Sequence, residues 1–398
     1  MSLPTIHRAL LIVTAGLLPV YLWRFSILGL PTNALEVLIV AAFAVGVLSP
    51  RIRADWRQSV RALGWDIKIF VLLFILASVI STLISPHLHT SLGVLKGWIL
   101  LPILYGWMVH GCVQVEARAQ VHILNTLILS AVAVSLFGLT QLGTLDRITS
   151  VYDVPNSLAL FIAPVLVMSV FRALSERSSW LWLASGVMFA AVIGSQVVGA
   201  FVALIATLLI GGIWLRPIFP SVIKRMGVVG LIGVIGIGGA LLWDRFEYLA
   251  SPQSSAAVRL QLWSVSWDLI QQHPFLGVGL GAFEPAYQEK LHERFAEHDK
   301  ELHTAEPLPE FVFRDPHNWI LSFWLNVGVL GLLSFTLLSW RSIVASWKNQ
   351  PEVSLALISI LLLGLIDTIY WKNDLSVSWW LLIVCMVQMG RTSSILRK

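Results

Sequence analysis

Long apolar runs separated by short polar or basic connections dominate the pattern along the chain. A helix crosses the roughly 30 Å of bilayer hydrocarbon with about 17 to 25 mostly apolar residues, because each residue adds about 1.5 Å. Twelve runs have this character, and they span approximately 9–27, 31–49, 65–85, 92–112, 120–141, 156–173, 179–195, 197–215, 227–243, 318–340, 353–371 and 375–391. The pattern predicts an all-α polytopic membrane protein with about twelve transmembrane helices.

The boundary between the runs 179–195 and 197–215 is the least distinct of these. Only Gly194-Ser195-Gln196 divides a continuous apolar stretch there. A single kinked helix does not cross a membrane twice, so we predict a tight hairpin at this point.

The composition agrees with a membrane protein. Apolar residues make up 57% of the 398 residues and charged residues only 12%, with a mean hydropathy of +0.80. Soluble proteins carry about 25% charged residues, so this chain has too little polar surface for a cytosolic enzyme, a disordered chain or a disulfide-framed secreted domain. Cys112 and Cys385 both fall in apolar runs, which indicates packing roles.

The basic residues define an orientation. In the short connections, 17 Lys and Arg residues fall on one side of the predicted membrane, and only Arg24, Arg147 and Lys372 on the other. Cytoplasmic loops carry the excess of Lys and Arg, so both termini are predicted to be cytoplasmic. The sequence pI near 9.4 is therefore a signal of topology, and no nucleic-acid partner is expected.

One exterior segment, residues 244–316, stands apart. It holds 12 of the 22 acidic residues against six basic ones. We therefore predict three parts: transmembrane helices one to nine in 1–243, an exterior helical loop with an amphipathic surface helix in 244–316, and helices ten to twelve in 317–398.

The exterior segment contains two patterns of interest. Arg259, Trp263 and Trp267 follow one another at intervals of four, so a helix ending near His273-Pro274 would place a cation beside an aromatic wall at the membrane surface. The glycine series in 277–281 lacks the spacing of a nucleotide-binding loop. We instead predict a turn in which the backbone comes close to another segment.

The segment closes with Arg314-Asp315-Pro316-His317-Asn318-Trp319. Asp is a favoured N-cap and Pro is common at the first helical position, which would place His317 in the first turn of span ten. The positive end of the helix dipole disfavours imidazolium there and attracts phosphate, so His317 is expected to be a neutral base near an anion site.

Plainer structural roles compete with these functional ones. His317 would also suit capping or packing, and Arg259 a surface ion pair. Lys96 and Asp367 fall inside predicted spans, where ionisable groups are often functional, but a pairing between these two for folding is an equal alternative. His87-Leu88-His89 and Asp299-Lys300-Glu301 lack the further ligands of a metal site, so no metal and no cofactor is expected.

Several of these residues together resemble the superfamily of O-antigen ligases, O-antigen polymerases and bacterial O-oligosaccharyltransferases. The resemblance covers most of the chain and is strongest from Arg259 to about Gly331. The pieces that carry it are Arg259-Leu260-Gln261-Leu262-Trp263, His273-Pro274-Phe275-Leu276-Gly277-Val278-Gly279-Leu280-Gly281-Ala282-Phe283, His317-Asn318-Trp319-Ile320-Leu321 and Val327-Gly328-Val329-Leu330-Gly331.

The resemblance implies a GT-C-like fold and a metal-independent transfer of a glycan in the bacterial inner membrane. The donor would be an undecaprenyl-diphosphate-linked glycan, and the acceptor a hydroxyl of lipid A core, of another glycan or of a protein, on the periplasmic face. It implies that Arg259 contacts the diphosphate and that His317 is the base. Asn318 and Trp263, which adjoin these two, are further candidates for substrate binding, and membrane lipids are expected partners.

One departure from the family pattern concerns a second arginine. The family often has a Ser-Arg-Gly-Ala element after the hairpin, and here Val198 stands where the arginine would be. Lys372, Arg314, Arg147 or Arg24 would have to replace it from the same surface, with Lys372 as the first choice.

The leading hypothesis is a glycan ligase, and a repeat-unit polymerase and a protein O-oligosaccharyltransferase share its motifs. A secondary transporter also suits twelve spans, but transporters place charged and broken helices at the midplane of two related halves. A non-catalytic envelope scaffold would be favoured if Val198 marked a loss of activity.

Overall fold

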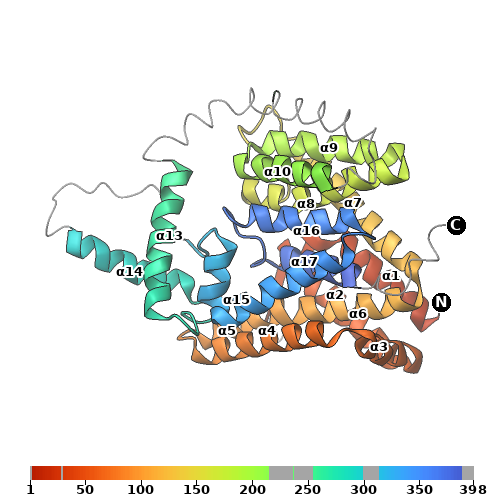
Figure 1. Cartoon of the computed structure of the whole chain (residues 1–398), viewed down its shortest axis with the longest axis horizontal. Helices are drawn as coiled ribbons and strands as arrows, with labels where there is room; N and C mark the ends of the chain where they lie inside the picture. The colour runs from red at the N-terminus through yellow and green to blue at the C-terminus, as the bar shows by residue number, and fades with distance from the viewer. Residues whose placement is uncertain (1, 28–29, 215–235, 237–253, 299–312, 388–398) are drawn as a thin grey trace.

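The computed structural model describes residues 2–27, 30–214, 236, 254–298 and 313–387 (Figure 1). Five helical runs in these residues are long and apolar enough to cross a membrane, and α2 with α3 makes a sixth if this pair, bent by 104°, counts as one span. The expected all-α membrane protein is confirmed. Two short strands, β1 (Arg24–Ile27) and β2 (Leu30–Asn33), form an antiparallel pair between the first helices.

Most helices overlap a predicted run, but the predicted span 9–27 is wrong, because the helix ends at Gly16 and a 3-10 helix and a strand follow. The first group comprises α1 (Leu3–Gly16), the 3-10 helix η1 (Leu18–Leu22), α2 (Ala34–Leu48), α3 (Pro50–Ala62), α4 (Trp65–Ile84), α5 (Leu88–Val94), the π-helical η2 (Leu95–Leu100), α6 (Leu101–Val115), α7 (Ala117–Leu139), α8 (Pro155–Glu176), α9 (Ser179–Ser195) and α10 (Val198–Trp214). The second group comprises α13 (Ser255–Gln272), α14 (Phe283–His298), α15 (Trp319–Ser346), α16 (Pro351–Leu363) and α17 (Asn373–Val387).

Not every predicted span is a full-length helix. The helices α1, α9, α10, α16 and α17 are apolar but only 10–17 residues long. The predicted span 227–243 lies outside the described residues. The count of twelve spans, the division into three parts and the GT-C-like fold therefore stay predictions.

The predicted hairpin between α9 and α10 is confirmed. Gln196 adopts a left-handed conformation with φ of 51°, and its backbone N–H bonds to the carbonyl of Ile193. A left-handed residue just after a helix ends the helix and reverses the chain. The next helix begins at once, at Val198.

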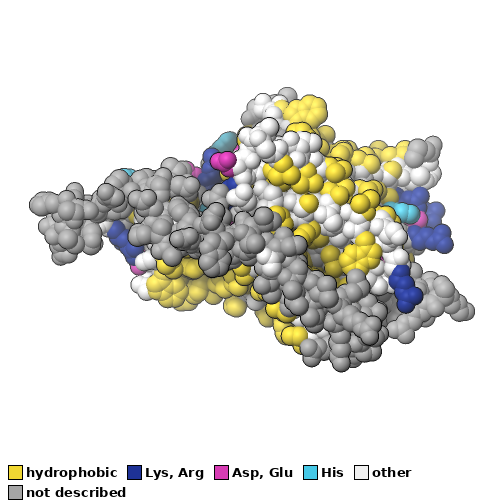
Figure 2. All heavy atoms as spheres, turned by 90° about the horizontal axis from the view of Figure 1, so that it is seen from above, with side chains coloured by type: hydrophobic (Ala, Val, Ile, Leu, Met, Phe, Trp, Pro, Cys, Tyr) yellow, Lys and Arg dark blue, Asp and Glu magenta, His cyan; other side chains and the backbone are white. Residues whose placement is uncertain are grey.

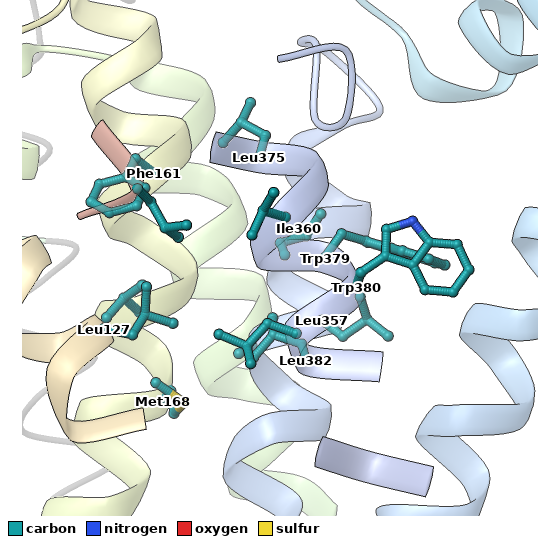
Figure 3. Packing of buried hydrophobic residues seen from close by; sticks show 14 of the residues in the cluster. Leu127, Phe161, Met168, Leu357, Ile360, Leu375, Trp379, Trp380 and Leu382 are labelled. Atoms are coloured by element: carbon teal, nitrogen blue, oxygen red, sulfur yellow. The ribbon is translucent and has the colours of Figure 1, made fainter. Parts of the chain in front are cut away.

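The core of the bundle lies between α7, α8, α16 and α17. Figure 3 shows this packing through the buried side chains of Leu127, Phe161, Met168, Leu357, Ile360, Leu375, Trp379, Trp380 and Leu382. On the face in Figure 2, hydrophobic side chains cover much of the middle, while Lys and Arg gather near the ends. An apolar exterior with charged ends is what a bilayer requires.

The glycine-rich loop 273–282 is inserted at a break in α15. The break is at Gly328, which has φ of 69° and ψ of 178° inside the helix. The backbone N–H of Val278 donates to Leu325 O over 2.9 Å, and the N–H of Val329 donates to Phe275 O over 3.1 Å. The predicted close backbone approach is confirmed, and it fixes α13 against α15.

Gly279→Ala is expected to lower stability by more than about 1 kcal/mol. Gly279 has φ of 107°, and an added Cβ would lie 2.8 Å from Ser85 Cα. Thermal unfolding of the detergent-purified protein measures the effect. Gly93→Ala is the matched control, because Gly93 is helical and has no atom within 4 Å of an added Cβ. Equal unfolding temperatures for the two variants would contradict the expectation.

Candidate active site

Asp367 is the residue around which the polar side chains converge. It lies in the connection 364–372 between α16 and α17, with its side chain only 8% exposed. Its Oδ1 is 3.1 Å from Nδ1 of His317. Its Oδ2 accepts a bond of 2.5 Å from the amide of Asn156 and lies 3.8 Å from Nη2 of Arg259. One carboxylate thus joins the candidate base to the candidate cation.

Three segments far apart in the chain deliver these partners. Asn156 is in the first turn of α8, Arg259 is one turn into α13, and His317 precedes α15. Arg259 is held from both sides, because its Nε donates to the carbonyl of Ile366 over 2.8 Å and its Nη1 to the carbonyl of Ser255 over 3.1 Å. A guanidinium has five N–H donors, so these two bonds leave others for a ligand.

The structure corrects the expected start of α15. Asn318, not Asp315, is the N-cap, and its side-chain oxygen accepts two backbone N–H bonds of the first turn. His317 therefore lies before the helix and not in its first turn. Its φ of 51° is left-handed, which an α-helix does not accommodate. The expectation that the helix dipole keeps His317 neutral, which required His317 to lie in the first turn, is therefore wrong.

Asp315 instead stabilises this left-handed turn. Its Oδ1 accepts the backbone N–H of His317 over 3.0 Å and the hydroxyl of Thr368 over 2.9 Å. Its Oδ2 accepts the hydroxyl of Ser322. Burial raises the pKa of Asp315, which the charge of His317 and these hydrogen bonds oppose.

Two aromatic residues, Trp263 and Phe313, lie next to His317. The indole N–H of Trp263 donates to the carbonyl of Pro316 over 3.0 Å. The ring of Phe313 meets the imidazole edge-on, with centroids 5.9 Å apart. Trp263, which was predicted to share a helical face with Arg259, thus also contacts the backbone next to His317.

The electrostatics of His317 differ from the sequence expectation. Burial lowers its pKa, but the hydrogen bond to Asp367 and the charges of Asp367 and Asp315 outweigh burial and the nearby Arg259, so the pKa of His317 is raised above its ordinary value. Burial would raise the pKa of Asp367, but its bond to His317 and the two nearby cations lower it. The two shifts favour an imidazolium beside a carboxylate, and the neutral base forms as the pH rises.

Asp367→Asn is expected to move the acidic limb of the pH–rate profile to lower pH. His317 must be neutral to accept a proton, and without the carboxylate its pKa falls because burial and Arg259 still disfavour the charge. Reaction rates between about pH 5 and 9 measure the limb. Asp268→Asn, which removes a carboxylate paired with Arg294 on α14, is the control. A limb that stays in place in Asp367→Asn would contradict the coupling.

Two further cations lie close to this network. Arg147 donates from Nε to the carbonyl of Ser195 over 3.0 Å and lies 3.5 Å, through Nη2, from Oδ1 of Asn156. Lys372 donates to the hydroxyl of Ser157 over 2.5 Å, one residue along α8. Arg147 is thus held by the α9–α10 turn, at the end of the hairpin where the family arginine is missing.

Arg314 and Arg24, the other two residues proposed to replace the missing arginine, lie apart from this network. Nε of Arg314 is 3.7 Å from a carboxylate oxygen of Glu284, and its side chain is 86% exposed. Arg24 is an exposed residue at the start of β1. Neither makes a hydrogen bond to Asp367, Asn156 or His317 in the described part of the chain.

The alternative that Lys96 pairs with Asp367 is wrong. Nζ of Lys96 lies 2.8 Å from Glu36 and donates to the carbonyl of Pro31 over 2.6 Å. The sequence identified Asp367 as unusual but not its partners, and it did not assign Asn156 a contact with this carboxylate. Asp367 is also outside the helices, because α16 ends at Leu363.

Among the described residues, no three His, Cys, Asp or Glu side chains form a group that could hold a metal ion. The candidate site is instead an acid–base and cation site. It combines a histidine oriented by a carboxylate with a guanidinium that retains free donors.

The sequence of this chain was compared with protein families and with individual known proteins. Residues 183–336 match a family model described as O-antigen ligase. The chain is also 25% identical over 303 residues to an O-antigen ligase of Salmonella typhimurium strain LT2, an alignment that covers 69% of this chain and 70% of that protein. The chain is therefore similar to O-antigen ligases. This similarity, together with the apolar helices, supports a glycan-transferring ligase in a multi-pass bacterial membrane protein.

The O-antigen ligase match covers only part of the site. Arg259 and His317 lie inside 183–336, whereas Asn156 and Asp367 lie outside it. The structure therefore adds residues that the matched region does not contain.

Proposed function

We propose that this chain transfers a glycan from an undecaprenyl-diphosphate carrier to a hydroxyl of lipid A core, at the periplasmic face of the bacterial inner membrane. Both termini are cytoplasmic in this proposal, as the distribution of Lys and Arg favours. The observation that carries it is the contact of one buried carboxylate, Asp367, with both a histidine and an arginine. A transferase of this kind needs a base for the acceptor and a cation for the leaving group.

His317 is the base in this reaction. Nδ1 faces Asp367, so the neutral ring carries N–H at Nδ1 and a lone pair at Nε2. Nε2 takes the proton of the acceptor hydroxyl as its oxygen bonds to the anomeric carbon. Asp367 orients the ring and stabilises the imidazolium that forms, as the carboxylate does in a Ser-His-Asp triad.

Arg259 stabilises the leaving group. The bond between the anomeric carbon and the phosphate oxygen breaks, and the electron pair leaves with the undecaprenyl diphosphate. The free N–H groups of Arg259 donate to the phosphate oxygens as negative charge develops on them. The proton held by His317 passes to the released diphosphate or to water, which returns the base.

Arg147→Gln is expected to raise KM for the lipid-diphosphate donor about tenfold. Arg147 lies between α7 and α8, bonds to Ser195 at the α9–α10 turn and reaches Asn156. We therefore assign it, ahead of Lys372, the place of the arginine missing at Val198. Donor titration of the rate gives KM. Lys290→Gln, which removes a cation paired with Glu293 on α14, is the control and leaves KM unchanged. A larger rise for Lys372→Gln than for Arg147→Gln would reverse the assignment.

The acceptor and the stereochemistry are tested together. The purified chain is given the lipid-diphosphate-linked glycan with lipid A core, a second carrier-linked repeat and a protein in competition. Base-assisted single displacement inverts the anomeric centre, so we expect glycosylated lipid A core with inverted configuration. Preferred transfer to the second repeat indicates a polymerase, transfer to protein indicates an O-oligosaccharyltransferase, and retained configuration contradicts direct displacement.

A further inference from the structure

Helix α3 carries a basic surface at the opposite end of the molecule from the site. It turns away from α2 by 104° and lies near the N-terminus, while α13 lies at the far end (Figure 1). Pro50 is in its first turn, and the hydroxyl of Ser49 accepts the backbone N–H of Ile52. This sharp corner between the apolar α2 and the charged, amphipathic α3 is typical of a helix that lies along the membrane surface.

The inner side of α3 is fixed in place. Ile52, Trp56 and Ser59 are buried, with Trp56 only 3% exposed. The indole fits because two glycines leave room for it: an added Cβ would lie 2.2 Å from its ring at Gly46 and 2.6 Å at Gly111. A helix anchored in this way presents its other side in a constant orientation.

The outer side carries a stripe of arginines. Arg53, Arg57 and Arg61 follow at intervals of four, so they share one face, and all three are exposed. Arg53 donates to the carbonyl of Val47 over 3.0 Å, and none of the three forms an ion pair with a carboxylate of the described residues. Asp55, the one carboxylate of α3, is half-buried and lies on another face.

The basic surface continues past the end of α3. Trp65 is 78% exposed, and Nζ of Lys68 lies 4.8 Å from its ring centroid. The neighbouring Asp66 is already paired with Arg341. A tryptophan beside a cation is characteristic of the headgroup region of a bilayer.

We propose that the basic surface formed by Arg53, Arg57, Arg61, Trp65 and Lys68 binds the phosphate headgroups of anionic phospholipids in the cytoplasmic leaflet. Clusters of Lys and Arg on an amphipathic helix attract such lipids, and the attraction is electrostatic. The bend places the arginine stripe at headgroup depth while Trp56 anchors the helix to the bundle. The basic surface therefore ties one end of the protein to the membrane surface independently of the transfer site.

Native mass spectrometry of the full-length chain in detergent, titrated with phosphatidylglycerol or phosphatidylcholine, tests this proposal. The wild type is expected to retain phosphatidylglycerol preferentially. The triple variant Arg53→Gln/Arg57→Gln/Arg61→Gln is expected to bind it about fivefold more weakly for each arginine removed, or about 100-fold in total. The matched control, Arg118→Gln/Arg177→Gln/Lys348→Gln, removes the same charge from the same predicted side and keeps the preference.

An unchanged phosphatidylglycerol preference in the triple variant, or an equal loss in the control, would overturn the proposal. A second measurement needs no variant. Surface electrostatics are screened by salt, so raising the ionic strength from about 0.05 to 0.5 M is expected to abolish the preference of the wild type. A preference that persists at high salt would also overturn it.

Discussion

His317→Ala is expected to slow glycan transfer by about 10² to 10⁴-fold, the range for loss of a general base. The variant removes the nitrogen that we propose accepts the proton of the acceptor hydroxyl, and it leaves Asp367 buried with Asn156 and Arg259 as partners. The loss should fall on kcat, because binding of the donor depends on the cations. Initial rates with saturating donor and acceptor measure it.

A control and a chemical test separate a base from a structural residue. His292→Ala changes a histidine of α14, outside the site, and should leave the rate unchanged. An acceptor with a more acidic hydroxyl needs less help from a base, so it should recover part of the rate in His317→Ala but gain less with the wild type. Equal rates for wild type and His317→Ala at the same unfolding temperature would contradict the role of His317.

Arg259→Ala is expected to lower kcat by about 10² to 10³-fold, the effect of removing one donor from a developing anion. Arg259→Lys should recover only part of this loss, because a lysine supplies charge without the planar fork of donors. The distance of 3.8 Å to Asp367 also means that Arg259 influences His317. Loss of Arg259 should therefore move the acidic limb of the pH–rate profile upward, since its charge lowers the pKa of His317.

The directions in which these two variants shift the acidic limb test the proposed electrostatics of His317. Arg259→Ala moves the limb to higher pH and Asp367→Asn moves it to lower pH, although both variants are slower than the wild type. Arg294→Ala breaks the ion pair with Asp268 between α14 and α13 and should leave the limb in place. A limb that shifts in the same direction in both site variants would contradict the proposed electrostatics.

The apolar pattern predicted most of the described helices, because burial in lipid requires long apolar runs and short polar breaks. The α9–α10 hairpin followed from three residues alone. The pattern could not show that α16 ends at Leu363, since the residues after it remain apolar. Asp367 was therefore placed inside a span, although it lies in the connection that builds the site.

The site was predictable only in part. Local patterns identified Arg259 and His317, but local rules misplaced the start of α15. The carboxylate of Asp315 accepts three hydrogen bonds and therefore does not cap α15. One of the donors, Thr368, lies 53 residues further along the chain. The contacts of Asp367 with His317 and Asn156 join three distant segments, and a single sequence holds no signal for such a contact.

The most direct test of the central claim is to count both products of one reaction. Purified wild type, Arg259→Ala and His317→Ala in detergent receive an undecaprenyl-diphosphate-linked oligosaccharide and lipid A core. The wild type should form glycosylated acceptor and free undecaprenyl diphosphate in equal amounts, and both variants should form almost none while still folded. A wild type that binds the donor but releases neither product would contradict the account, and Val198 would then mark a chain that has lost transfer.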